Sequence, residues 1–205
     1  MPFEIKDFSI APLTDNKFIR PVQLTYTQDG KQRCWEAVKS HDNVAVLLYH
    51  RDKEAFLTVK QFRPAVYLHH PAHNFTYELC AGLVDKALSL KDIIREEIDE
   101  ECGYQVSIEQ ISKISSFFTH VGVTGCKQHL YLAVIDESMR IHSGGGIAKE
   151  QILLEFIPLR QARKFLFNEA LAKTPGLMFA FTWFLEHYGE KAEKLFTDEP
   201  NDPPA

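Results

Sequence analysis

Residues 82–104 read GLVDKALSLKDIIREEIDEECGY, and the second half of this stretch predicts an amphipathic helix. Ser89 is a good N-cap, with Asp92 as a capping-box partner three residues on, and Gly103 suits the left-handed position that follows a helix. The helix is therefore expected to run to about Cys102. At about 100° per residue its apolar residues form one continuous arc: Leu90, Ile93, Ile94, Ile98 and Cys102.

Two glutamates of this helix, Glu97 and Glu101, fall inside the apolar arc, and Glu100 lies at its edge. Carboxylates that face a core repel each other and resist desolvation, so they take up protons or recruit a cation. A divalent metal with oxygen ligands resolves this conflict, and Mg²⁺ is the usual choice beside phosphates. The alternative is an acidic helix with a solvated face, but the position of the two glutamates favours a metal site.

The rest of the sequence predicts strands on both sides of this helix and further helices at the end. Runs rich in Val, Leu, Thr and aromatic residues predict strands at 18–26, 33–39, 44–49, 55–62, 77–80, 111–119, 129–135 and 152–157. Residues 63–76 are expected to form a loop, and helices are expected at 159–172 and 176–188. This order is typical of an α/β (α+β) fold, a mixed sandwich of strands and helices.

Composition narrows the class of protein. The 205 residues carry a formal net charge of −5 without a basic stripe, which argues against a nucleic-acid partner. No apolar run approaches the roughly 20 residues of a membrane span, and no secretory h-region follows Met1, so we expect a cytoplasmic protein without a membrane partner. The cysteines form no CxxC pair and are expected to be small buried hydrophobes of a reducing compartment: Cys34, Cys80, Cys102 and Cys126.

The opening stretch resembles the Nudix box, usually written GX5EX7REUXEEXGU with U an aliphatic residue. Gly82, Glu97, Ile98, Glu100, Glu101 and Gly103 match it at the correct spacing. The resemblance implies Glu97 and Glu101 as metal ligands, Glu100 in support, and the backbone carbonyl of Ala81 as a further ligand. The cofactor it implies is Mg²⁺, with Mn²⁺ as an alternative.

Three positions depart from the box. Leu88 stands in place of the first Glu, Glu96 in place of the Arg, and Tyr104 in place of the last aliphatic residue. In the family that Glu and Arg hold the box together. Here the helix must be braced in another way, and neighbouring Arg95 is the candidate.

Segments outside the box look like the ADP-ribose and UDP-sugar pyrophosphatase branch of this superfamily, which includes animal UDP-glucose pyrophosphatases. They lie at 35–48, 59–67, 77–85, 144–147 and 173–185. The resemblance implies a Nudix α/β/α sandwich with a mixed sheet over residues 43–190, a nucleotide-sugar substrate and a homodimer. Residues 1–42 would form an N-terminal β-strand arm used in dimerisation, and 191–205 a flexible C-terminal tail.

Cleavage of a diphosphate needs neutralised charge, an in-line water and a base. Arg63 follows a strand, where its planar fork could hold a phosphate; the alternative is a surface ion pair. In the resembled branch an acid on a mobile loop activates the water, and Glu150 matches that position, with Gly144–Gly146 as hinges. Trp35 either stacks on the base or belongs to the core, and His120 is a candidate substrate contact.

By this resemblance the expected reaction is hydrolysis of UDP-glucose to UMP and glucose 1-phosphate. Residues 118–125 contain no proline, which in the family pattern favours UDP-sugars over ADP-ribose. A second acid often found two residues after the base is replaced by Ile152. ADP-ribose hydrolysis, or nucleotide binding by a catalytically impaired Nudix fold, are the alternatives.

Overall fold

Strand β3 (Asn43–His50) lies inside an eight-stranded sheet and is covered on both faces. The computed structural model describes residues 5–14, 19–147 and 150–189. Successive side chains of a strand point to opposite faces, and here both sets are buried, as is typical of a strand with helices on either side. One set packs under α2, namely Val44, Val46 and Leu48, and the other packs under α4, namely Ala45, Leu47 and Tyr49.

The sheet is mixed, as the sequence predicted. Its strands follow the order β10-β5-β4-β3-β8-β7, while β6 pairs with β3 and β9 pairs with β4. The β3–β8 and β10–β5 pairs are parallel and the others are antiparallel. The strands are β4 (Ala55–Gln61), β5 (Thr76–Glu78), β6 (Cys80–Leu83), β7 (Ile111–Thr119), β8 (Cys126–Ile135), β9 (Leu153–Pro158) and β10 (Ala172–Lys173).

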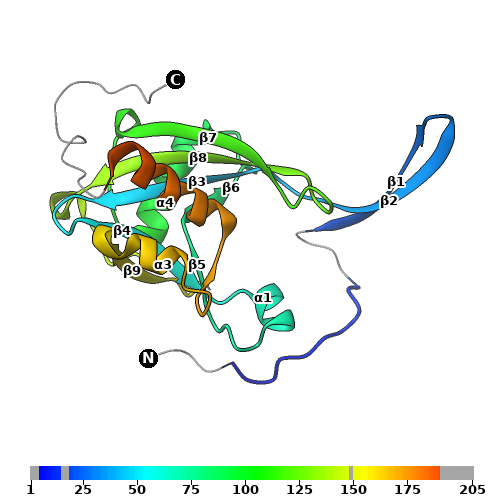
Figure 1. Ribbon diagram of the computed structural model, residues 1–205, viewed down its shortest axis with the longest axis horizontal. Helices are drawn as coiled ribbons and strands as arrows, with labels where there is room; N and C mark the ends of the chain where they lie inside the picture. Colours follow the sequence, from blue (N-terminus) through cyan, green and yellow to red (C-terminus); the bar gives the residue numbers. More distant parts are fainter. Residues whose placement is uncertain (1–4, 15–18, 148–149, 190–205) are drawn as a thin grey trace.

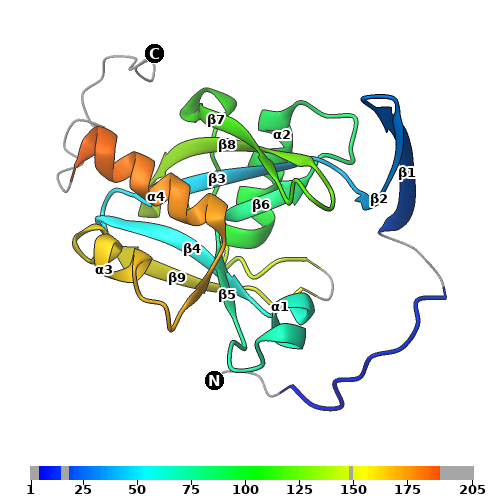
Figure 2. The same cartoon turned by 45° about the vertical axis from the view of Figure 1, so that its right-hand side comes forward.

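Helices cover both faces of this sheet, so the predicted α/β/α sandwich is confirmed (Figures 1 and 2). Helices α3 (Ala162–Leu166) and α4 (Pro175–Tyr188) lie over one face, and α2 (Leu90–Glu97) lies over the other. None of the helices in the described ranges is long and apolar enough to cross a membrane, and the cytoplasmic location stays a prediction. The shorter helices are α1 (Pro64–His69), η2 (Ile108–Gln110), η3 (Glu137–Met139) and η4 (Leu159–Gln161).

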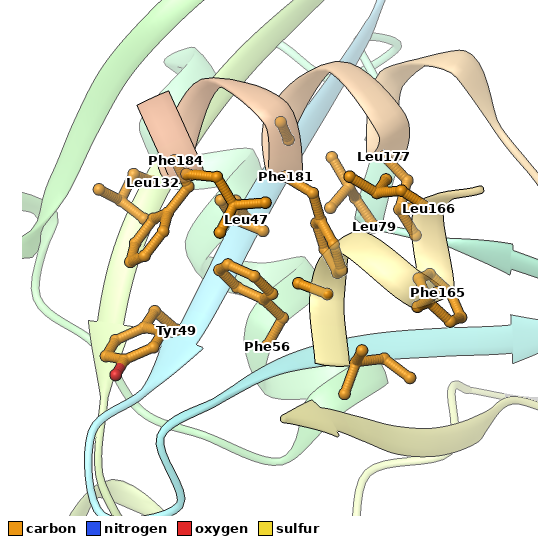
Figure 3. Close-up of a cluster of buried hydrophobic side chains, with 14 of the residues drawn as sticks. Leu47, Tyr49, Phe56, Leu79, Leu132, Phe165, Leu166, Leu177, Phe181 and Phe184 are labelled. Atoms are coloured by element: carbon orange, nitrogen blue, oxygen red, sulfur yellow. The ribbon is translucent and has the colours of Figure 1, made fainter. Parts of the chain in front are cut away.

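Aromatic side chains fill the space between α4 and the sheet (Figure 3). The ring of Phe56 lies 4.1 Å from that of Phe181 and meets Phe184 edge-on at 4.8 Å. Tyr49 stacks on Phe184 at 5.0 Å. Such aromatic pairs stabilise a core beyond the area that they bury, and these hold α4 across β3 and β4.

Strands β1 (Arg20–Gln28) and β2 (Lys31–Lys39) form an antiparallel hairpin that projects from the sheet (Figure 1). Asp29 and Gly30 join them with φ of 52° and 73°, which is typical of the two-residue turn that matches strand twist. This hairpin is the predicted N-terminal arm; its role in dimerisation stays a prediction. It meets the β7–β8 turn through two hydrogen bonds, from Trp35 Nε1 to the Gly122 carbonyl and from the Val38 N–H to the Val123 carbonyl.

Several local predictions were wrong. The expected loop at 63–76 contains α1, which Pro64 begins at the favoured first position. The helix expected at 159–172 ends at Leu166, because the chain turns at Asn168 and then adds β10 to the sheet beside β5. Pairing with a sheet edge thus overrides the helical preference of that segment.

The cysteines agree with the prediction at three of four positions. Cys80, Cys102 and Cys126 are buried, whereas Cys34 is exposed on the arm, and all four are free thiols. Cys34 is exposed because both faces of the arm are accessible within this chain. The predicted tail at 191–205 lies outside the described residues.

Candidate active site

The glutamate-rich helix changes its winding where its carboxylates gather. Helix α2 begins at the predicted cap, because the Asp92 N–H donates to Ser89 Oγ. It ends at Glu97 and continues as a π-helical turn, η1 (Ile98–Cys102), before Gly103 closes it with φ of 75°. The predicted end is therefore confirmed, and a single π turn of this kind is frequent at functional sites.

Glu101 lies buried at the end of this helix, with 6% of its surface exposed. Its Oε2 accepts a hydrogen bond of 3.1 Å from the Ala81 N–H, which ties the helix to β6. Burial raises the pKa of Glu101 to about 8, the bonds from Cys80 and Ala81 lower it, and the charges of Glu97 and Glu150 raise it. This carboxyl group therefore keeps its proton near neutral pH unless a cation compensates its charge.

Glu97 packs directly over the backbone of Gly82. A Cβ at position 82 would lie 2.1 Å from Glu97 Oε1, so only glycine leaves room for this carboxylate. Burial raises the pKa of Glu97 to about 7, with a further rise from Glu100 and a lowering by the ammonium of Lys86. The matching positions of the motif, Gly82 and Glu97, are thus linked by direct contact.

The donor set formed by these side chains suits a hard divalent cation. Glu97 and Glu101 are desolvated carboxylates that repel each other, and Glu100 and Glu150 add negative charge nearby. Oxygen donors of this kind are the ligands that Mg²⁺ and Ca²⁺ prefer. Within the described ranges, no three His, Cys, Asp or Glu side chains already converge as a complete metal site. Backbone carbonyl, water or substrate oxygens would have to complete the coordination.

The glycine-rich loop after β8 binds the end of the same helix. The N–H groups of Gly145 and Gly146 donate to the carbonyls of Glu101 and Glu100, at 2.8 and 3.1 Å. Gly144 has φ of 67°, and a Cβ there would lie 2.4 Å from the Glu101 carbonyl oxygen. The loop therefore satisfies carbonyls that a helix end leaves unpaired. Close backbone packing requires these glycines, whereas their role as hinges stays a prediction.

Glu150 follows this loop, and the structure places it beside the carboxylates. Its Oε2 accepts a hydrogen bond of 3.1 Å from the Ile147 N–H, and its own N–H donates to the Ile147 carbonyl. Its charge is near enough to raise the pKa of both Glu97 and Glu101. The side chain is exposed, so a water molecule can reach its remaining oxygen, Oε1.

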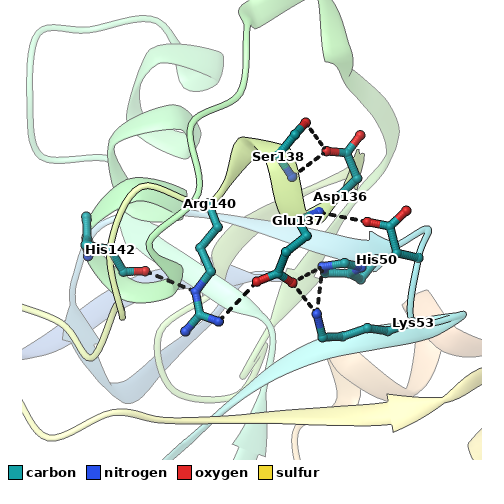
Figure 4. A network of polar contacts seen from close by, with 8 residues as sticks. His50, Lys53, Asp136, Glu137, Ser138, Arg140 and His142 are labelled. Atoms are coloured by element: carbon teal, nitrogen blue, oxygen red, sulfur yellow. Dashed lines mark hydrogen bonds and ion pairs between the residues drawn. The ribbon is translucent and has the colours of Figure 1, made fainter.

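A polar network that the sequence did not reveal holds the segment leading into this loop (Figure 4). Glu137 contacts the buried His50 at 3.4 Å, pairs with Lys53, and approaches Arg140 at 3.5 Å. The Arg140 Nε donates to the His142 carbonyl, and the His142 ring contacts Asp99 Oδ1 at 2.7 Å. These contacts run from the β3–β4 turn to η1, so they position the loop against the helix.

Arg63 lies at the end of β4 and forms a two-point ion pair with Glu78. Its Nε and Nη2 each donate a bond of 2.7 Å, to Oε1 and Oε2 of Glu78 respectively. The charges of Glu101 and Glu150 also act on Arg63, which places its guanidinium beside the carboxylate cluster. The two predictions for Arg63, ion pair and phosphate contact, are therefore compatible.

The brace that replaces the Glu–Arg pair of the box is not Arg95. Arg95 bonds only its neighbour Asp92, at 3.2 Å, within the described contacts. Instead the ammonium of Lys86 pairs with Glu96 Oε2 at 2.7 Å and joins the loop before the helix to the helix itself. The direction of charge is reversed relative to the box, with the cation on the loop and the acid on the helix.

Trp35 lies on β2 and donates its indole N–H to Gly122 of the β7–β8 turn, which also contains His120. Trp35 is 53% exposed, so the prediction that it belongs to the core is wrong. His120 has φ of 47°, and its carbonyl accepts the N–H groups of Val123, Thr124 and Gly125. In the described part of the chain no hydrogen bond or ion pair joins either residue to the carboxylates, so their contact with a substrate stays a prediction.

A mixed-sheet α/β/α sandwich with this acidic loop–helix–loop is the fold and site of a Nudix hydrolase. The chain belongs to the Nudix-related sugar-nucleotide pyrophosphatases, hydrolases that typically use divalent metals. It is 32% identical to uridine diphosphate glucose pyrophosphatase NUDT14 of Bos taurus over 88% of this chain and 94% of the relative. The Mus musculus protein of the same name is 33% identical over the same shares.

Bacterial relatives extend the comparison to a second sugar nucleotide. The GDP-mannose pyrophosphatase of Cronobacter sakazakii is 33% identical over 73% of this chain and 79% of the relative. No family model matches the sequence. Membership in the family therefore rests on these relatives, and the chain is a nucleoside-diphosphate-sugar pyrophosphatase.

Proposed function

We propose that this chain hydrolyses UDP-glucose to UMP and glucose 1-phosphate with Mg²⁺. The observation that carries the proposal is that the buried Glu101 lies near Glu97 and Glu150, and that Arg63 lies near Glu101 and Glu150. Diphosphate cleavage requires a group of cation ligands, a hydrogen-bond donor to the phosphate and a base that water can reach. The names of the two mammalian relatives support UDP-glucose as the substrate.

The protein's own residues divide the chemistry between them. Glu97, Glu101 and the Ala81 carbonyl would hold the metal, which supplies charge neutralisation and a Lewis acid at the diphosphate. The guanidinium of Arg63 donates hydrogen bonds to a phosphate oxygen. Glu150 Oε1 takes a proton from the attacking water, since Ile147 holds Oε2. The water oxygen bonds to one phosphorus. The bond from that phosphorus to the bridging oxygen breaks, and the bridging oxygen leaves with the other phosphate.

Trp35 and His120 are proposed as contacts for the nucleoside or sugar. The half-exposed indole ring offers a flat apolar surface of the kind on which a base stacks. Its N–H donates to the Gly122 carbonyl, which fixes the ring against the β7–β8 turn that contains His120. Replacing Trp35 by Ala should raise KM for the nucleotide sugar without changing the metal requirement.

The chain is further proposed to form a homodimer through its arm. Cross-strand neighbours place most of the large apolar side chains of the hairpin on one face, and most of that face is exposed. An isolated two-stranded hairpin is marginally stable in water, so a second copy covering this face would stabilise it. The apolar face consists of Val22, Leu24, Tyr26, Trp35 and Ala37.

GDP-mannose is the second candidate substrate, because bacterial relatives carry that name. ADP-ribose hydrolysis and nucleotide binding without catalysis are the remaining alternatives. The last is motivated by Ile152, which is buried in the core under α2 where related enzymes often place an acid.

Turnover of UDP-glucose, GDP-mannose and ADP-ribose, measured in parallel with Mg²⁺ and with EDTA, tests the proposal. UMP and glucose 1-phosphate should form fastest, and EDTA or Glu101→Gln should abolish them. If mannose 1-phosphate or ribose 5-phosphate forms faster, the preferred substrate is GDP-mannose or ADP-ribose, respectively, and the proposed mechanism is unchanged. Absence of turnover on all three, with retained nucleotide binding, would favour the non-catalytic alternative.

A further inference from the structure

Glu78 is a buried carboxylate outside the group of proposed metal ligands, and it forms an ion pair with Arg63. Only 8% of its surface is exposed, on the short strand β5 between β4 and β10. A carboxylate is expensive to bury unless it is paired and hydrogen-bonded. Both of its oxygens accept bonds from Arg63, at 2.7 Å each, which is the strongest geometry of an Arg–carboxylate pair.

This pairing uses one edge of the guanidinium and leaves another. Glu78 takes the edge formed by Nε and Nη2. The remaining donors are the two N–H groups of Nη1 and the outer N–H of Nη2, which form a second edge suited to two phosphate oxygens. The Arg63 side chain is 47% exposed, so this second edge is open to solvent.

Arg63 interacts with nearby carboxylates and with the backbone of α1. The pKa of Arg63 is raised first by its bonds with Glu78 and further by the charges of Glu101 and Glu150. The carbonyl of Arg63 also accepts the N–H groups of Val66 and Tyr67, so the first turn of α1 holds its backbone in place. Both ends of the side chain are therefore held beside the acidic cluster.

We propose that Glu78 is a positioning residue, which fixes Arg63 so that its second edge grips the diphosphate of the substrate. The inference deepens the proposed function, on which it rests for the identity of the ligand. Arg63 alone would lose rotamer entropy on binding, because a long side chain must be ordered. The two hydrogen bonds to Glu78 order the Arg63 side chain before the ligand binds.

A double-mutant cycle with a non-hydrolysable ligand tests this role. The ligand is UDP-glucose with a methylene group in place of the bridging oxygen, titrated calorimetrically with Mg²⁺ into the wild type, Glu78→Gln, Arg63→Ala and the double variant. Glu78→Gln should weaken binding about tenfold by freeing Arg63. The double variant should bind no more weakly than Arg63→Ala alone, because Glu78 acts only through Arg63.

Two further measurements keep the outcome clear. Arg63→Ala leaves a buried carboxylate unpaired, whereas the double variant removes both charges, so thermal unfolding of the two separates misfolding from lost binding. Millimolar methylguanidinium should restore binding to Arg63→Ala, where Glu78 can hold it, and not to the double variant.

Unchanged affinity in Glu78→Gln, or losses that add in the double variant, would overturn the role of Glu78. So would rescue of the double variant by methylguanidinium. Because the ligand is not hydrolysed, these results are independent of turnover. A wild type that binds it with this pattern but cleaves no nucleotide sugar would refute the proposed function and leave the inference standing.

Discussion

The carboxylate of Glu97 occupies the space that any side chain at position 82 would fill. The first residue of the box and Glu97, the first of the proposed metal ligands, are therefore one steric unit. The absence of a single carbon atom at Gly82 lets a charged group lie against backbone. The same unit explains why the two residues recur at a fixed distance in the motif.

Gly82→Ala should displace Glu97 and weaken metal binding about 10- to 100-fold, since supporting groups of a metal site have effects of that size. Gly122→Ala is the matched control, because no atom lies within 4 Å of a Cβ there. Titration of Mn²⁺ followed by calorimetry compares the two variants. Equal affinities would contradict the steric account.

Metal binding should strengthen as pH rises through the range from about 7 to about 8, where the pKa values of Glu97 and Glu101 lie. The metal displaces protons from both groups, so its affinity should fall about tenfold or more per pH unit below that range. Mn²⁺ titrations at several pH values provide the measurement. Glu101→Gln should flatten the profile, and a flat profile in the wild type would contradict the raised pKa values.

The same pKa values set the pH dependence of stability without metal. The folded chain holds these two protons above the ordinary pKa of 4.5, whereas the unfolded chain releases them. Its free energy of unfolding should therefore fall as pH rises from about 5 to 8. Urea unfolding in EDTA at a series of pH values checks the sign, and added Mg²⁺ should remove the decline.

Sequence periodicity indicated Glu97 and Glu101, but it could not indicate the partner of Arg63. A helical wheel places residues of one helix on a common face. Glu78 is 15 residues from Arg63, on a different strand, and meets it only through the pairing of β4 with β5. Lys86 and Glu96 were hidden for a similar reason, because their contact depends on the path of an irregular loop.

At the scale of elements, the glutamate-rich helix α2–η1 and the glycine-rich loop form one assembly. The loop donates two backbone N–H groups to the carbonyls of Glu100 and Glu101. Ile147 at the end of this loop holds Glu150, the proposed base, so the position of Glu150 depends on the same contacts. The network around Glu137 and Arg140 anchors the other side of the loop.

Gly144→Ala should separate the loop from the helix. Its φ of 67° strains any other residue, and a Cβ would overlap the Glu101 carbonyl, so we expect a loss of about 2–5 kcal/mol in stability. Gly125→Ala is the control, since it has φ of 60° with no atom within 4 Å and should lose only about 1–2 kcal/mol. Urea unfolding gives both values, and equal losses would exclude the packing contribution.

The ion pair between Lys86 and Glu96 should hold the loop against the helix equally well when the two charges are exchanged. Glu96→Lys places two cations together and should lower kcat/KM a few-fold, because exposed pairs contribute less than about 1 kcal/mol. Adding Lys86→Glu should restore activity. Initial rates on UDP-glucose at low salt measure the effect, and a double variant as impaired as Glu96→Lys would show that the pair is not a brace.

The elements that the sequence predicted well are those whose pattern is local. The buried strands and α4 carry long apolar runs, and η1 ends at a glycine in the left-handed region. The π-helical turn was not predicted, since no residue pattern distinguishes it from α-helix. The helix expected at 159–172 was too long, because β10 gains its stability from pairing with β5, a long-range contact.

At the scale of the whole molecule, the arm has few contacts with the rest of the described chain. Its hairpin meets the β7–β8 turn through two hydrogen bonds, and its apolar face is mostly exposed. If a second copy packs on this face, Trp35 lies at the dimer interface. The arm would then serve both association and the substrate site.

Leu24→Asp should weaken the proposed dimer, because it places a charge in the apolar face of the hairpin. Thr25→Asp is the control on the opposite face of the same strand. Light scattering should report a mass near 23.5 kDa for Leu24→Asp and twice that for the control and the wild type. A wild type already at the single-chain mass would rule out the dimer.

The reversed ion pair between Lys86 and Glu96 also bears on how this protein can diverge. The attraction between loop and helix would survive if both partners exchanged sign or if one partner moved by two positions. The Nudix box, with Glu at position 88 and Arg at position 96, is then one of several ways to hold the loop against the helix by opposite charges. Among related sequences, positions 86, 88 and 96 are therefore expected to covary, and a fixed-letter pattern overlooks the chains that took another solution.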